Sequence, residues 1–153
     1  GHIDQSLFAR TILDEKNGPP PEVNLFNEKN NGETILNLID KGYVKSAHDI
    51  SLGGLLVAIS KMCIRGNKGI KINKSKNLIN EIEYFFAEDQ GRYLIEVNKD
   101  DLKEVTKILN KNSVHHEELG IITQNDMIIN EKTKVTIDEL KSYYTNWLSK
   151  YMS

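Results

Sequence analysis

The 153-residue chain has one cysteine, one tryptophan and no apolar run longer than residues 55–59. A single cysteine excludes an internal disulfide and a cysteine-rich zinc site, and the apolar neighbours of Cys63 predict a buried, unreactive thiol. A membrane span needs about 20 apolar residues, and no basic segment precedes a signal-like stretch. We therefore expect a cytoplasmic protein with no membrane partner.

The charge of the chain is nearly balanced, and this balance bears on whether the chain binds nucleic acid. The chain carries 20 Lys and Arg against 22 Asp and Glu residues, a formal net charge of −2. Nucleic acids and anionic membranes attract strongly basic surfaces, so we expect no nucleic-acid partner. Apolar residues make up 39% of the chain, which is enough for one ordinary domain with its own core.

Proline is confined to one place, residues 19–21. Three consecutive prolines exclude a helix interior or a central strand and favour a stiff, extended connection. Because residues 1–13 have helical apolar spacing, residues 1–21 are predicted to form a lead-in helix and a Pro-rich connection. Residues 22–153 are predicted to form one α/β domain.

Beyond the prolines, the apolar spacing changes between helical and strand-like periods. Helices are predicted at 32–41, 55–65 and 101–110, and strands at 43–50, 69–73, 83–87, 92–97, 117–123 and 126–130. A capping box, Thr136-x-x-Glu139, predicts a last helix with an apolar stripe formed by Ile137, Leu140, Tyr144, Trp147, Leu148 and Tyr151. This order predicts an α/β (α+β) sandwich in which helices cover a mixed sheet.

The stretch "AHDISLGGL", residues 47–55, lies where a predicted strand becomes a helix. Such a junction points backbone N–H groups and the positive end of the helix toward the turn, which suits a phosphate. Gly53 and Gly54 would allow a close approach, Asp49 could bind a metal ion, and Ser51 could bind phosphate. Alternatively the turn is purely structural, with Ser51 as helix cap. Spacing alone favours this alternative, because neither a Walker lysine nor a G-x-G-x-x-G pattern is present.

Three histidines and one arginine are further candidates. His48, at a strand end, is predicted to be a hydrogen-bonded structural residue. His115 and His116 precede two glutamates, but adjacent strand side chains point to opposite faces, so we expect no shared metal ion. Arg92 lies beside two acidic residues and could either anchor a phosphate or hold its turn through an ion pair; both alternatives stay open.

Five segments resemble, in order, motifs of the phosphoribosylformylglycinamidine synthase family, which acts in purine biosynthesis; they are "QSLFARTI", "GPPPEVNL", "SAHDISLGGLLVAISKM", "FFAEDQGRYLIEV" and "NWLSKYM". The resemblance runs from about Gln5 to Met152. Each half of these synthetases resembles aminoimidazole ribonucleotide synthetase. The resemblance implies that this chain has that enzyme's C-terminal α/β fold and is the second such domain.

The resemblance also implies an activity. The family's synthetase uses ATP, Mg²⁺ and glutamine-derived ammonia to convert formylglycinamide ribonucleotide to formylglycinamidine ribonucleotide. Its catalytic histidine and main ATP-binding residues lie in N-terminal domains, so we expect this chain alone to be inactive and to bind no cofactor tightly. The implied partners are the remaining synthetase domains, a glutaminase subunit and a small accessory subunit. The alternatives are a non-catalytic scaffold, or the equivalent domain of selenophosphate synthetase or thiamine monophosphate kinase.

The resemblance assigns site residues only indirectly. In the catalytic half of the family, an acid at the position of Asp49 binds magnesium, and a triplet matching residues 88–90 contacts substrate. This chain resembles the other half, so its residues are predicted as an auxiliary nucleotide or phosphate site with Asp49 as metal ligand. Leu52 stands where the family has an acid, which weakens the metal prediction. No catalytic residue is predicted; the site is Asp49, Ser51, Gly53, Gly54, Glu88, Asp89, Gln90 and Arg92.

Overall fold

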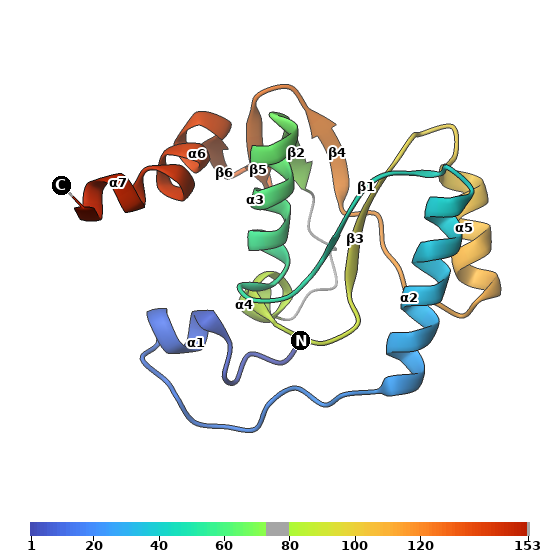
Figure 1. Ribbon diagram of the computed structural model, residues 1–153, viewed down its shortest axis with the longest axis horizontal. Coiled ribbons are helices and arrows are strands. Elements are labelled where there is room, and N and C mark those ends of the chain that lie inside the picture. The colour runs from blue at the N-terminus through green and yellow to red at the C-terminus, as the bar shows by residue number, and fades with distance from the viewer. Residues whose placement is uncertain (73–79, 153) are drawn as a thin grey trace. The chain divides into compact units, whose positions relative to one another are not determined.

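A computed structural model describes residues 1–72 and 80–152 (Figure 1). No helix within these residues is long and apolar enough to cross a membrane. The helices of the described residues are α1 (Leu7–Ile12), α2 (Leu25–Asp40), α3 (Gly54–Gly66), α4 (Glu81–Phe86), α5 (Leu102–Lys111), α6 (Ile137–Thr145) and α7 (Trp147–Met152). The strands are β1 (Val44–Asp49), β2 (Gly69–Ile72), β3 (Tyr93–Val97), β4 (Gly120–Thr123), β5 (Asp126–Ile129) and β6 (Thr133–Thr136).

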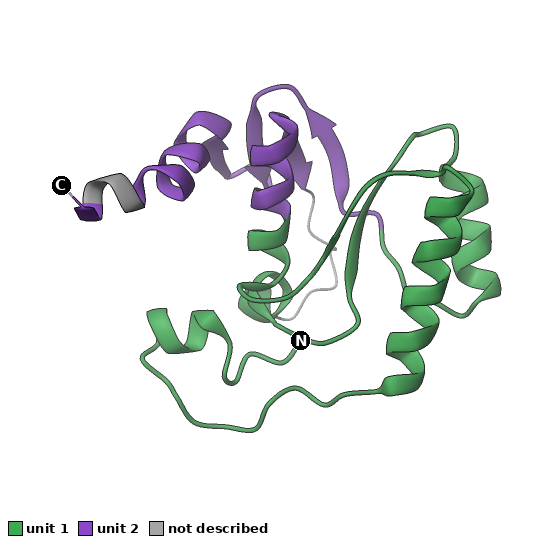
Figure 2. Cartoon of the chain, viewed as in Figure 1, with its two compact units in different colours: residues 1–58, 80–117 green, residues 59–79, 118–153 purple. Residues whose placement is uncertain are grey.

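The chain forms two compact units, neither of which is continuous in sequence (Figure 2). The first unit contains residues 1–58 and 80–117, and the second contains residues 59–79 and 118–153. Helix α3 begins in the first unit and ends in the second.

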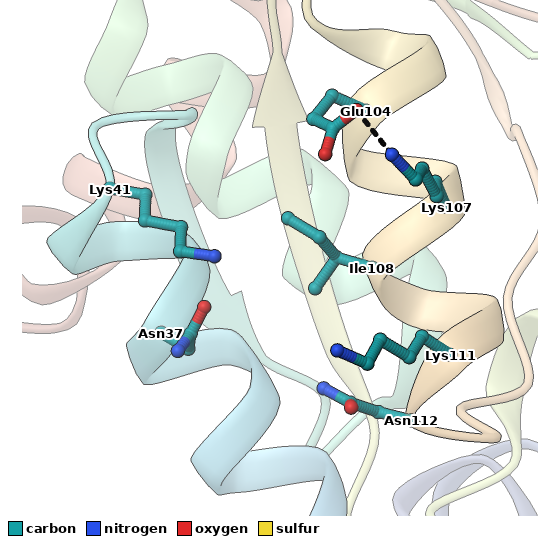
Figure 3. Close-up of a pocket in the computed structure, with 7 residues that line it drawn as sticks. All are labelled: Asn37, Lys41, Glu104, Lys107, Ile108, Lys111 and Asn112. Atoms are coloured by element: carbon teal, nitrogen blue, oxygen red, sulfur yellow. Dashed lines mark ion pairs between the residues drawn. The ribbon is translucent and has the colours of Figure 1, made fainter.

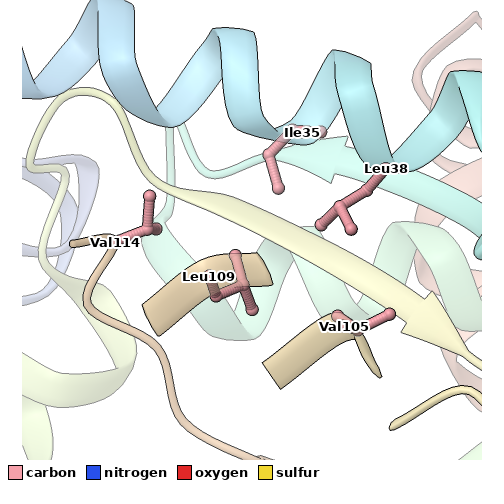
Figure 4. Close-up of a cluster of buried hydrophobic side chains, with 5 residues drawn as sticks. All are labelled: Ile35, Leu38, Val105, Leu109 and Val114. Carbon is pink, nitrogen blue, oxygen red and sulfur yellow. The ribbon is translucent and has the colours of Figure 1, made fainter. Parts of the chain in front are cut away.

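The first unit has an antiparallel pair of strands, β1 and β3, with Ala47 opposite Ile95. Helices α2 and α5 present apolar side chains at three- and four-residue spacing, which places them on one face of each helix. Together with Val114, which follows α5, these side chains form the buried cluster that Figure 4 shows: Ile35, Leu38, Val105, Leu109 and Val114. The cluster is this unit's apolar centre, and β1 and β3 contribute partly buried side chains to it.

The second unit has a four-stranded mixed sheet in the order β4-β2-β5-β6. Strand β2 is antiparallel to β4 and parallel to β5, and β6 is antiparallel to β5. Helix α6 follows directly, because the Thr136 side chain accepts the Glu139 N–H at 3.1 Å, as the capping box predicts. The predicted mixed α/β class is confirmed, although the strands divide between two sheets where the sequence pattern predicts one.

One predicted strand is wrong: residues 83–87 belong largely to helix α4. The Asn80 side chain accepts the Ile82 N–H at 3.0 Å and thereby caps a helix start. Glu81 and Glu83 occupy the first turn, where negative charge is favourable. The cap and the helix dipole therefore outweigh the strand propensity of the aromatic run.

Other boundaries also differ from the prediction. Helix α2 begins at Leu25, seven residues before the predicted start at 32, because Asn24 caps it by accepting the Asn27 N–H at 3.0 Å. Strand β6 has no counterpart in the prediction. Residue 73, the end of one predicted strand, lies outside the described residues. The predicted C-terminal helix divides at Asn146 into α6 and α7.

We expect Leu38→Ala to lower the free energy of unfolding by about 2–5 kcal/mol, because it opens a cavity in the first unit's core. The Leu38 side chain is 0% exposed, whereas Leu36, on the same helix, is 61% exposed. Leu36→Ala is therefore the matched control and should change stability by less than about 0.5 kcal/mol. Urea denaturation monitored by circular dichroism measures both variants. Equal losses in the two would contradict the assignment of the core.

Candidate functional site

The turn between β1 and α3 is held by backbone hydrogen bonds. The Ile50 N–H donates to the Arg92 carbonyl oxygen at 2.9 Å, and the Gly54 N–H donates to the Ser51 carbonyl oxygen at 2.9 Å. Gly53 and Gly54 have φ values of +87° and +70°, a conformation that is costly for other residues. A Cβ on Gly54 would also lie 2.7 Å from the backbone of Phe86. The turn geometry and the close packing against α4 therefore require glycine here.

The anion position of this turn is filled by the protein itself. Oε1 of Glu88 accepts the Gly53 N–H at 2.8 Å and the Leu7 N–H at 2.7 Å. These two N–H groups lie at the N-terminal ends of α3 and α1, which carry partial positive charge. The Glu88 carboxylate therefore takes the place that a phosphate would occupy at a helix start.

The neighbouring Asp89 and Arg92 form hydrogen bonds and an ion pair next to Glu88. Asp89 Oδ1 accepts the His2 N–H at 3.0 Å, and Asp89 Oδ2 lies 3.5 Å from Arg92 Nη1. Arg92 Nη1 also donates to the Ala87 carbonyl oxygen at 3.3 Å. Of the two alternatives for Arg92, the structure shows the ion pair, which joins Arg92 to Asp89 within the segment between α4 and β3. The N-terminal segment is hydrogen-bonded to these acidic residues, through His2 to Asp89 and through Leu7 to Glu88.

Three predicted site residues have exposed side chains. The Asp49 side chain is 68% exposed, and its carboxylate lies 3.5 Å from Nδ1 of His48. Ser51 and Gln90 are also exposed. Ser51 is not the cap of α3, because that helix begins three residues later, at Gly54. His48 is hydrogen-bonded as predicted, with Nδ1 2.5 Å from the Asp49 carbonyl oxygen.

Asp49 has no cluster of further acidic ligands around it among the described residues. Within residues 1–72 and 80–152, no three His, Cys, Asp or Glu side chains come together as metal ligands. Mg²⁺ is usually bound by one or two carboxylates together with substrate phosphates and water. The turn offers the exposed Asp49, whereas position 52, where the resemblance implies an acid, is Leu52, and Glu88 is engaged by backbone N–H groups. The metal and the auxiliary nucleotide site stay predictions.

A polar pocket of about 280 Å³ lies between α2 and α5 and was not indicated by the sequence. Figure 3 shows Lys41 and Lys111 extending toward the space between the two helices, while Lys107 pairs with Glu104 at 3.6 Å. Lys41 caps α2, and Lys111 is the last residue of α5. Cations at helix C-termini stabilise the helix dipole, which accounts for both without a ligand.

Two further candidates have structural roles. The Tyr84 hydroxyl donates to the Glu117 carboxylate, and burial together with this carboxylate raises the pKa of Tyr84. His116 Nδ1 lies 2.9 Å from the Val114 carbonyl oxygen. Residues 115–118 precede β4, so the strand predicted at 117–123 begins only at Gly120. No sequence pattern indicates the pair of Tyr84 and Glu117, which lie 33 residues apart.

The single thiol is buried, as the sequence predicts. Cys63, on α3, is a free and buried cysteine, which confirms the expectation of a buried thiol. Its burial raises the pKa of the Cys63 thiol to about 11. A thiol with so high a pKa is a poor nucleophile near neutral pH, because little of it is thiolate.

These features define a mixed α/β domain whose strand-to-helix turn is closed by a carboxylate of its own chain. The family model for the AIR synthase related protein, C-terminal domain, matches residues 5–130, and the chain belongs to this family.

Curated relatives extend the similarity over nearly the whole chain. The phosphoribosylformylglycinamidine synthase subunit PurL of Pelagibacter ubique (strain HTCC1062) is 65% identical over 152 residues, which are 99% of this chain and 21% of the relative. The subunit of the same name from Bartonella henselae is 36% identical over 151 residues, 99% of this chain and 20% of the relative. The chain thus spans about a fifth of the length of the curated relatives it matches.

Solved structures share the fold. Thermotoga maritima PurL complexed with ADP superposes with a TM-score of 0.69 at 17% identity, covering 92% of this chain and 24% of that one. The structure of PurLQS from the same organism gives a TM-score of 0.67 at 20% identity, with the same two coverages of 92% and 24%. These low identities show the fold alone.

We expect Glu88→Ala to lower the free energy of unfolding by about 1–3 kcal/mol, because two N–H groups lose a charged acceptor. Asp49→Ala removes an equal charge from an exposed side chain of the same turn and is the control, with an expected change below about 0.5 kcal/mol. Chemical denaturation at neutral pH compares the two. A Glu88→Ala variant as stable as Asp49→Ala would contradict the structural role of this carboxylate.

We also expect Cys63 to react slowly with iodoacetamide in the folded chain. With a pKa of about 11 in place of 9.0, the thiolate at pH 8 is roughly a hundredfold scarcer than in the unfolded chain. The folded rate should rise with pH until about 11. Mass spectrometry of the alkylated peptide measures it, with urea-unfolded chain as reference. Equal rates in both states would overturn the burial argument.

Proposed function

We propose that this chain is a domain of the synthetase subunit of phosphoribosylformylglycinamidine synthase and supplies structure to it, without catalytic groups of its own. The observation that carries the proposal is 65% identity over 99% of the chain to a subunit of that name. This identity favours the synthetase over the alternative of an equivalent domain from selenophosphate synthetase or thiamine monophosphate kinase.

The geometry of the turn supports a structural role. Its anion position holds the Glu88 carboxylate, and Asp49 is a lone exposed acid. A nucleotide phosphate would have to displace Glu88 from the Gly53 N–H, so we expect the isolated chain to bind no nucleotide tightly. ATP and Mg²⁺ belong to the proposed parent enzyme; Thermotoga maritima PurL has been solved in complex with ATP.

The proposal includes partners and location. PurL of Thermotoga maritima occurs in a structure named PurLQS, which supports a multi-subunit assembly. The partners that we propose are the remaining synthetase domains, a glutaminase subunit and a small accessory subunit. We propose the cytoplasm as the site of this assembly, and we assign the chain no nucleic-acid or membrane partner.

A chimera tests the proposal. Replacing the matching fifth of the Pelagibacter ubique subunit with this chain should preserve ATP-dependent amidine formation within about tenfold, because 65% identity retains most packing contacts. The assay measures phosphate release and amidine product in the presence of the partner subunits. The 153-residue chain alone should show no turnover.

The control is the same subunit without its matching fifth, which we expect to be inactive. A folded chimera without activity would contradict the assignment of this chain to the synthetase. Turnover by the chain alone would contradict the proposed structural role.

A further inference from the structure

We propose that the exposed aromatic face of α6 and α7 docks onto another part of the synthetase polypeptide. The aromatic face consists of Tyr143, Tyr144, Trp147, Tyr151 and Met152, each more than half exposed. The inference rests on the proposed function, because it takes its occupant from the remainder of that subunit.

Three residues of this face, Tyr144, Trp147 and Tyr151, have the spacing of a buried helix face. Ile137, Leu140, Tyr144, Trp147 and Tyr151 follow one another at intervals of three or four residues, which places them along one stripe. The backbone at Asn146, between α6 and α7, is close to helical, so the stripe continues past it. A stripe at this spacing normally faces a core.

The stripe begins in the core and then leaves it. Ile137 is only 4% exposed, whereas Tyr144, Trp147 and Tyr151 are 56%, 61% and 83% exposed. The sequence thus specifies a buried face that the described residues do not bury. A run of exposed aromatic residues at this spacing is uncommon on a domain that functions alone.

Its chemistry and size suit a protein interface. Tyr, Trp and Met are enriched where protein interfaces are driest. Given how exposed they are, the four aromatic side chains present roughly 600 Å², close to the ~800 Å² that each partner contributes to a stable interface. A small ligand would not need so large a surface.

The length of the Pelagibacter ubique subunit indicates what occupies the aromatic face. The chain matches 21% of the Pelagibacter ubique subunit, so roughly four fifths of such a polypeptide lies outside it. Another apolar patch, at the start of α2, contains Leu25 and Phe26, which are 75% and 78% exposed. Phe26 is the single aromatic ring of that patch, and it is exposed but lies outside the aromatic face. Phe26 therefore serves as a matched exposed control.

Hydroxyl-radical footprinting of native side chains tests this inference. Trp147, Tyr151 and Phe26 are oxidised in the isolated chain and in the chimeric subunit, and mass spectrometry measures each rate. We expect oxidation of Trp147 and Tyr151 to be about tenfold slower in the chimera, since a docked partner excludes water, and Phe26 to be unchanged. Replacing Tyr144 and Trp147 by serine should restore rapid oxidation of Tyr151.

Each outcome of this experiment either supports or overturns the docking face. Equal oxidation of Trp147 in both proteins overturns the docking face, whether or not the chimera makes amidine, so failure here is distinct from failure of the proposed function. Equal slowing of Trp147 and Phe26 indicates general shielding and also overturns it. Protection in the isolated chain, with a dimer in sedimentation that the serine variant abolishes, assigns the face to a second copy instead. If the chimera does not fold, the isolated chain is footprinted with the truncated subunit, and an unchanged rate counts against docking.

Discussion

The Glu88 carboxylate, which accepts backbone N–H groups from the starts of two helices, is the interaction on which the turn depends. A helix start exposes unpaired donors and a partial positive charge, and it needs an acceptor. In nucleotide-binding turns a phosphate meets that need. Here Oε1 of Glu88 meets it at 2.8 Å from Gly53 and 2.7 Å from Leu7. The same contact therefore fixes α1, orients the beginning of α3 and occupies the position of an external anion.

Elements specified by nearby residues could be predicted from the sequence. Strand β1, helix α3 and the cap at Thr136 each follow from local spacing or a local hydrogen bond. Residues 83–87 mislead because their aromatic run has strand propensity, and the deciding cap is Asn80, just outside the run. The division of strands between two sheets depends on pairing between distant segments, which local periodicity does not report.

The membership of the candidate site stays a prediction, and the hydrogen bonds of its residues could not be predicted from the sequence. Sequence resemblance pointed to Glu88 and Asp89, and their acidic side chains pointed to Arg92; in the structure Glu88 bonds to Gly53, and Asp89 pairs with Arg92. Their partners were hidden because Glu88 contacts Leu7 across 81 residues and Asp89 contacts His2 across 87. Asp49 shows the converse: its position in the motif suggested a ligand, yet burial and contacts cannot be read from a motif.

The interleaving of the two units constrains how the gene can change. Because the chain passes between them at 58/59, 79/80 and 117/118, no single cut yields either unit whole. A reading frame interrupted after Glu117 would remove β4 and β5, leaving β2 with neither hydrogen-bonded neighbour. Natural shuffling is therefore expected to move the two units together.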